Sequence, residues 1–148
     1  RAAIIKAFLI KNYEWKDGEE YMGLNEKCTE PAYILGRLFA VLESIQKDAN
    51  PGINSTIRDR YFNSACATPA TVFPVLIKLK NSHVKKLERD SVGAKIYYEK
   101  LLSEIMEKVE MSEEKMGFSK RLSLEEQGKF MLGYYHQMQK KYEKKEEK

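Results

Sequence analysis

The sequence is poor in the residues that staple small secreted proteins or bind metals. Its 148 residues include two cysteines, two histidines and one tryptophan. Cys28 and Cys66 lie far apart and match no metal-ligand spacing. A chain of this length can bury a core without a disulfide, so we expect both thiols to be free.

Long apolar runs are also absent. No stretch approaches the roughly 18 apolar residues that cross a bilayer. The apolar segment at residues 1–9 is interrupted by Lys6 and is followed by no secretory cleavage site. The hydrophobic fraction of 43% and the aromatic fraction of 11% are ordinary for a globular protein. We therefore expect a soluble, cytoplasmic protein without membrane contact, folded as one domain over residues 1–148.

Catalytic motifs are missing as well. The sequence shows no serine, histidine and acid in a recognisable nucleophile context and no glycine-rich phosphate loop. His83 lies within an apolar arc, and His136 has no second histidine or cysteine at metal spacing. Asp59, between Arg58 and Arg60, suits a local ion pair better than a catalytic base. We expect no enzymatic activity, cofactor or metal; a base role for either histidine is the alternative that alanine substitution would test.

Apolar periodicity predicts an all-α fold, a single compact bundle of about five helices without a sheet. In the first part of the chain, the pattern predicts a short helix at 2–11, a loop at 12–30 and a helix from Pro31 that ends at Asn50-Pro51-Gly52. A short helix follows that contains Ile57, Tyr61 and Phe62 and is capped by Asn54 or Ser55, and after it comes a long basic helix. The last part is predicted to have a helix opening at 91–93, a connection at 110–122 and a final helix that begins at the capping box Ser123–Glu126. Residues 140–148 are predicted to be a frayed charged tail.

The long basic helix can start in two ways. If Thr71 caps it, Pro74 falls in the first turn and costs little; if Thr68 caps it, Pro74 breaks a hydrogen bond. We favour Thr71. Its predicted core face is Val72, Leu76, Leu79, His83 and Leu87, and the predicted stripe of the last helix is Leu124, Gly128, Met131, Tyr135, Met138 and Tyr142, with Gly128 at a close helix contact.

Positive charge is concentrated in residues 54–90. The whole chain has a net charge of +4, and this segment alone carries seven basic against three acidic side chains. We select as candidate nucleic-acid contacts Arg58, Arg60, Lys78, Lys85, Lys86 and Arg89. A solvated surface would explain the same pattern, but a basic helix face with two turn arginines favours phosphate contact.

Six aromatic residues could stack on nucleobases: Tyr61, Phe62, Tyr97, Tyr98, Tyr134 and Tyr135. Tyrosines at helical spacing more often bury the ring and leave the hydroxyl at the rim. We therefore expect most of these rings in the core.

Several ordered phrases carry a resemblance to a known family. They are PAYILGRLFAVLE at residues 31–43, DANPGIN at 48–54, IRDRYF at 57–62, ATPA at 67–70 with VFP at 72–74, and LSLEEQG at 122–128 leading into GYYHQ at 133–137. The sequence resembles the C-terminal region of the large subunit of the type I-C CRISPR Cascade surveillance complex. That subunit is much longer, and the matching region corresponds to a small subunit that is translated separately from the same reading frame.

The resemblance implies a helical, non-catalytic subunit for antiviral defence. It implies binding of the displaced non-target DNA strand, which would stabilise the R-loop, with the large subunit, backbone subunits, a second copy of the chain and crRNA as neighbours. The alternative is a purely structural subunit that packs against Cascade proteins and crRNA without touching DNA. The resemblance supplies no residue-level DNA contacts, so the six basic residues rest on charge geometry.

Overall fold

The computed structural model describes residues 23–112 and 118–146, and these residues form helices without a strand. The helices are α2 (Pro31–Ala49), α3 (Ile57–Ala67), α4 (Pro69–Asp90), α5 (Val92–Ser112) and α6 (Leu124–Glu146). The all-α prediction is confirmed. The predicted helix at 2–11, the first part of the loop at 12–30 and residues 113–117 of the predicted connection lie outside the described residues.

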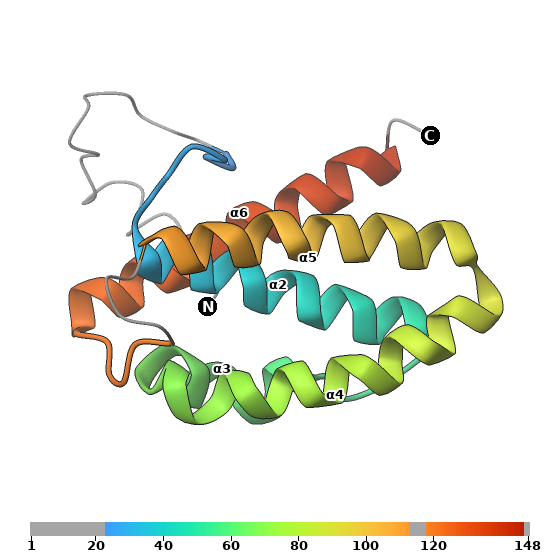
Figure 1. Cartoon of the computed structure of the whole chain (residues 1–148), viewed down its shortest axis with the longest axis horizontal. Coiled ribbons are helices and arrows are strands. Elements are labelled where there is room, and N and C mark those ends of the chain that lie inside the picture. Colours follow the sequence, from blue (N-terminus) through green and yellow to red (C-terminus); the bar gives the residue numbers. More distant parts are fainter. Residues whose placement is uncertain (1–22, 113–117, 147–148) are drawn as a thin grey trace.

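Helix α2 is the centre of the molecule. It runs between α5 on one side and α3 and α4 on the other, and α6 crosses behind it (Figure 1). Every residue from Ala32 to Ile45 is buried. The helix begins at Pro31, where the missing N–H costs nothing. It ends before Pro51 and Gly52, and Gly52 adopts a φ of +82° that favours glycine.

Two glycines set the crossing of α2 and α6. A Cβ added at Gly36 would lie 1.9 Å from the carbonyl oxygen of Phe130, and one added at Gly133 would lie 2.1 Å from that of Tyr33. Both obstacles are backbone atoms, which cannot rotate away. On α6 the sequence predicted a close helix contact at Gly128, which stays a prediction; the contact that the structure shows is at Gly133.

Polar side chains also join α2 to α6 inside the core. The pairs are Tyr33 Oη with His136 Nδ1 at 2.9 Å, Arg37 Nε with Gln137 Oε1 at 3.0 Å, and Glu43 with the hydroxyl of Tyr134. Burial of a polar group is tolerable when it is hydrogen-bonded, so these pairs fix how the two helices face each other. Burial, followed by the bond to Glu43, raises the pKa of the Tyr134 hydroxyl.

The predicted core stripe of α6 is right in its middle and wrong at its ends: Met138 is buried, and Met131 and Tyr135 pack against the core. Leu124 is 86% exposed and Tyr142 is 51% exposed, while the buried side of the helix contains Phe130, Gly133 and Tyr134. That side also carries His136 and Gln137, which hydropathy assigns to solvent. Their partners on α2 cannot be read from the α6 sequence alone, and this is why the predicted stripe left them out.

Helix α4 begins at Pro69 with Thr68 as its N-cap, so the prediction of a start at Thr71 is wrong. The neighbouring segment favours the earlier start: the N–H of Ala70 donates to the carbonyl of Ser119 at 3.0 Å. Pro74 therefore lies inside the helix, where it withholds one hydrogen bond, but its ring is exposed and disturbs no packing.

The core face of α4 is predicted correctly at Val72, Leu76 and Leu87, which are buried, but not at its other two positions. Phe73 is fully buried and stacks on Phe118, with ring centroids 5.2 Å apart. Leu79, predicted in the core, is 37% exposed, and His83 is half-buried. The buried side of α4 is therefore wider than predicted and is centred between Phe73 and Val84, which leaves Leu79 at its edge.

The helix caps are partly as predicted. The capping box of α6 is present. The N–H of Ser123 donates to the carboxylate of Glu126 at 3.1 Å, and the N–H of Glu126 donates to the hydroxyl oxygen of Ser123 at 3.2 Å. The cap of α3 is Thr56, rather than Asn54 or Ser55, because the carboxylate of Asp59 accepts from the Thr56 N–H at 2.8 Å. Asp59 thus serves this cap rather than the ion pair that was predicted.

The charged segment that was predicted to fray from residue 140 is helical as far as Glu146. Two of its lysines anchor it to the rest of the fold. Lys141 pairs with Asp48 at 3.2 Å, and Lys140 pairs with Glu26.

Both cysteines are free and buried. Burial raises the pKa of the Cys66 thiol to about 12 and also raises that of Cys28. Because the thiolate is the reactive form, neither residue should react with a thiol reagent at pH 8 within minutes in the native protein, and both should react in denaturant. Ellman's reagent measures this; rapid modification of the native chain would contradict the packing around these residues.

Candidate nucleic-acid interface

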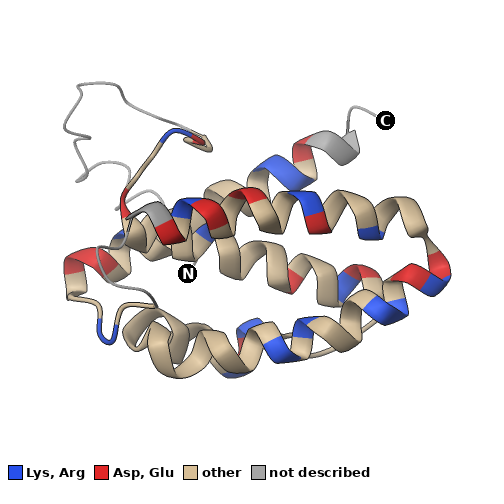
Figure 2. Cartoon of the chain, viewed as in Figure 1, with Lys and Arg blue, Asp and Glu red and all other residues tan. Residues whose placement is uncertain are grey.

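The outer side of α4 carries a row of cations. Lys78, Lys85 and Arg89 are all exposed and lie opposite the buried side of the helix. They make no hydrogen bond or ion pair with any described residue. Figure 2 shows basic residues spaced along α4 toward its junction with α5. We call these three residues the α4 basic face; their predicted exposure is confirmed.

Many basic residues elsewhere are neutralised by acidic partners. The ion pairs are Lys47 with Glu43, Lys95 with Glu88 and Glu99, Lys129 with Glu30, Lys140 with Glu26, and Lys141 with Asp48. The cations of the α4 basic face have no such acidic neighbour to displace, so they are available to an external anion. Exposed cations without an ion pair also occur outside α4, for example Lys27 and Lys100, so what sets the α4 basic face apart is that three of them share one side of one helix.

Lys86 and His83 lie beside the α4 basic face. Lys86 is exposed, and its ammonium donates to the side-chain oxygen of Asn50, which ties the end of α4 to the turn after α2. Burial, and then the nearby charge of Lys86, lowers the pKa of His83. His83 is therefore neutral at neutral pH and adds nothing to the positive charge of this helix.

The two arginines that the sequence placed in a turn, Arg58 and Arg60, lie in helix α3 and have different surroundings. Arg58 donates to the hydroxyl of Tyr135 at 2.8 Å, and its guanidinium carbon lies 5.4–5.7 Å from the ring centroids of Phe62, Tyr134 and Tyr135. Arg60 is exposed and makes none of these contacts. Sequence reasoning selected both arginines but missed Tyr135 as a partner. The spacing of Arg58 and Phe62, four residues apart on one helix, could have indicated the Phe62 contact but not the one with Tyr135.

The six candidate aromatic residues divide between core and rim. Tyr98 and Tyr134 are buried, and their hydroxyls donate to Asp48 and Glu43. Tyr61, Phe62 and Tyr135 are half-buried, and Tyr97 is 49% exposed. Tyr61, Phe62 and Tyr135 pack against the core that contains Tyr98 and Tyr134, so the expectation that most of these rings belong to the core is confirmed.

Comparison with known proteins decides the family. The family model described as CRISPR-associated protein (Cas_Csd1) matches residues 1–142 of the 148. The chain belongs to this Cas_Csd1 family. No curated protein matches the chain significantly. The matched residues include the α4 basic face and both arginines of α3. The whole candidate interface therefore lies within the region that matches the family.

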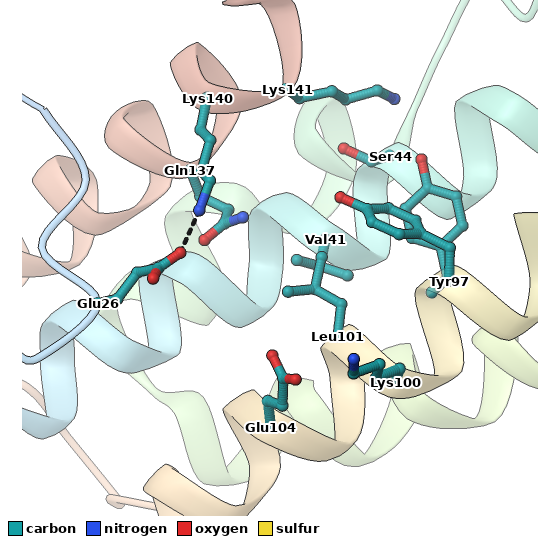
Figure 3. Close-up of a pocket in the computed structure, with 11 residues that line it drawn as sticks. Glu26, Val41, Ser44, Tyr97, Lys100, Leu101, Glu104, Gln137, Lys140 and Lys141 are labelled. Atoms are coloured by element: carbon teal, nitrogen blue, oxygen red, sulfur yellow. Dashed lines mark hydrogen bonds and ion pairs between the residues drawn. The ribbon is translucent and has the colours of Figure 1, made fainter. Parts of the chain in front are cut away.

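In the described part of this Cas_Csd1 chain, a cleft between α2, α5 and α6 is lined by Tyr97 and Tyr98 but by none of the six candidate basic residues. It holds about 220 Å³ and is lined by side chains of both signs, among them Glu26, Lys100 and Glu104 (Figure 3). The cation of Lys140 is paired with Glu26 at its edge. No histidine or cysteine lines it, and its serine, Ser44, donates to the carbonyl of Ala40 at 2.8 Å.

Neither a metal cluster nor a membrane-spanning helix occurs among the described residues. Within residues 23–112 and 118–146, no three histidine, cysteine or acidic side chains converge on one point. No helix in the same part of the chain is both long and apolar enough to cross a bilayer.

Proposed function

We propose that the chain is a non-catalytic subunit of a type I-C Cascade complex that holds the displaced non-target DNA strand and so stabilises the R-loop. The observation that carries the proposal is the α4 basic face, whose exposed cations lack acidic partners in the described structure. Family membership places the chain in CRISPR biology. The six candidate contacts remain Arg58, Arg60, Lys78, Lys85, Lys86 and Arg89.

Phosphate contacts suit this task. Each cation that neutralises a phosphate releases a counterion, which gives affinity without reading sequence. A displaced strand has a different sequence at every target, so a subunit that holds it gains from such contacts. The α4 basic face supplies them from one rigid helix.

A second function is favoured by a separate observation. Val92 is 58% exposed and Ile96 is 60% exposed, one turn apart at the start of α5. Exposed apolar side chains next to one another suit contact with a neighbouring protein. On this alternative the chain is an assembly subunit that packs against the large subunit, backbone subunits or a second copy, with its cations facing protein or crRNA.

Dissociation of the R-loop tests the primary proposal. The complex is assembled with and without this chain, and its release is measured from double-stranded target and from the target strand alone. If the chain holds the displaced strand, it should slow release from the duplex target several-fold and leave release from the single target strand unchanged, because only the duplex supplies a displaced strand. An equal effect on both substrates would contradict the proposal and favour the assembly function.

A further inference from the structure

Arg58 is held in place more firmly than an ordinary surface arginine. Its hydrogen bond to the Tyr135 hydroxyl is 2.8 Å long, and three aromatic ring centroids lie within 5.7 Å of its guanidinium carbon. These contacts come from two helices, since Phe62 belongs to α3 and Tyr134 and Tyr135 belong to α6. The side chain has therefore already lost much of the rotamer freedom that a long side chain would lose on binding a ligand.

Arg58 nevertheless remains exposed, and Phe62 and Tyr135 beside it are half-buried. The site thus presents a planar cation to solvent, supported from behind by rings. Arginine planes and aromatic rings are the surfaces on which proteins stack unpaired nucleobases. A lysine could supply the same charge but no plane.

We propose that Arg58, supported by Phe62 and Tyr135, is a stacking platform for one unpaired base of the displaced strand. The inference rests on the proposed function and adds a base-binding position to the phosphate contacts of α4. A base inside a duplex has its faces covered by its neighbours, so this platform selects single-stranded over double-stranded DNA. Phosphate contacts alone do not require unpaired bases.

Two oligonucleotides of equal length separate stacking from charge: oligothymidylate, and an abasic strand with the same number of phosphates. Fluorescence anisotropy of labelled strands with the full chain measures both affinities. We expect the affinity of the wild-type chain for the thymidine strand to be at least about fivefold higher than for the abasic strand, because stacking of one base adds that much binding free energy. Arg58→Lys, which keeps the charge, should bind both strands equally and retain its affinity for the abasic one.

Arg60→Ala is the matched control, because Arg60 is an exposed arginine of the same helix without the ring contacts. Arg60→Ala should lower the affinity for both strands by the same factor and so preserve the preference for the thymidine strand. Thermal melting shows whether Arg58→Lys keeps the fold. Equal binding of both strands by the wild-type chain, or a preference that survives Arg58→Lys, would overturn the platform and leave phosphate binding intact. Binding of neither strand would overturn the proposed function as well.

Discussion

The variant with Lys78, Lys85 and Arg89 all replaced by alanine is expected to bind single-stranded DNA between about ten- and a hundredfold more weakly at 0.1 M salt. Each phosphate contact contributes about 0.7 to the slope of log affinity against log salt for single strands, so loss of three contacts should lower that slope by about 2. The effect on stability should be small, because all three side chains are exposed and unpaired within the described structure. Titration at several salt concentrations measures both quantities.

A control variant separates this face from overall charge. Lys27, Lys100 and Lys120 are exposed and lie outside α4, so their replacement by alanine removes the same charge elsewhere. The control should keep most of the affinity. Equal losses in the two variants would show that net charge, rather than the α4 basic face, governs binding. If the α4 variant fails to enter the complex before DNA is added, the charges serve assembly instead.

Gly36→Ala is expected to destabilise the fold by about 3 kcal/mol or more. Its new Cβ would lie 1.9 Å from a backbone oxygen of α6, so the two helices would have to separate and loosen the buried pairs between them. Gly133→Ala should behave alike, since its Cβ would meet the backbone of Tyr33 at 2.1 Å. For a domain of this size, thermal melting should show a decrease of about 10 °C or more for either variant.

Gly93→Ala is the matched control for these variants. It also lies in a helix, but the nearest atom to its added Cβ is the hydroxyl oxygen of Ser91, at 3.9 Å. Alanine favours helix over glycine by about 1 kcal/mol, so Gly93→Ala should be neutral or stabilising. A melting temperature of Gly36→Ala close to that of the wild type would contradict the crossing of α2 and α6 described above.

The sequence was sufficient to predict α2 but not the face of α6. In α2, large apolar residues, a starting Pro31 and the stop at Asn50-Pro51-Gly52 all indicate one buried helix. In α6 the buried side includes His136 and Gln137, whose burial depends on Tyr33 and Arg37 of another helix. Apolar periodicity describes one element at a time, so it cannot identify a polar residue that is buried by its partner.

In the candidate site, too, features of a single helix could be predicted from the sequence, whereas contacts between helices could not. Charge counting located the α4 basic face, because exposed cations on one helix need no tertiary partner to be recognised. The surroundings of Arg58 could not be predicted, since Tyr135 lies 77 residues further along the chain. The start of α4 was misplaced for a related reason: Ala70 finds its hydrogen-bond acceptor in Ser119, far away in sequence.

Site-specific crosslinking shows whether the α4 basic face contacts the displaced strand. Ser82 is exposed between the cations of this face, and its hydroxyl bonds only locally, to the carbonyl of Leu79 at 2.8 Å. A photoreactive amino acid at position 82 should crosslink to the labelled non-target strand of the assembled complex, and only after the R-loop has formed. Crosslinks to crRNA or to a protein neighbour, without any to the non-target strand, would contradict the account.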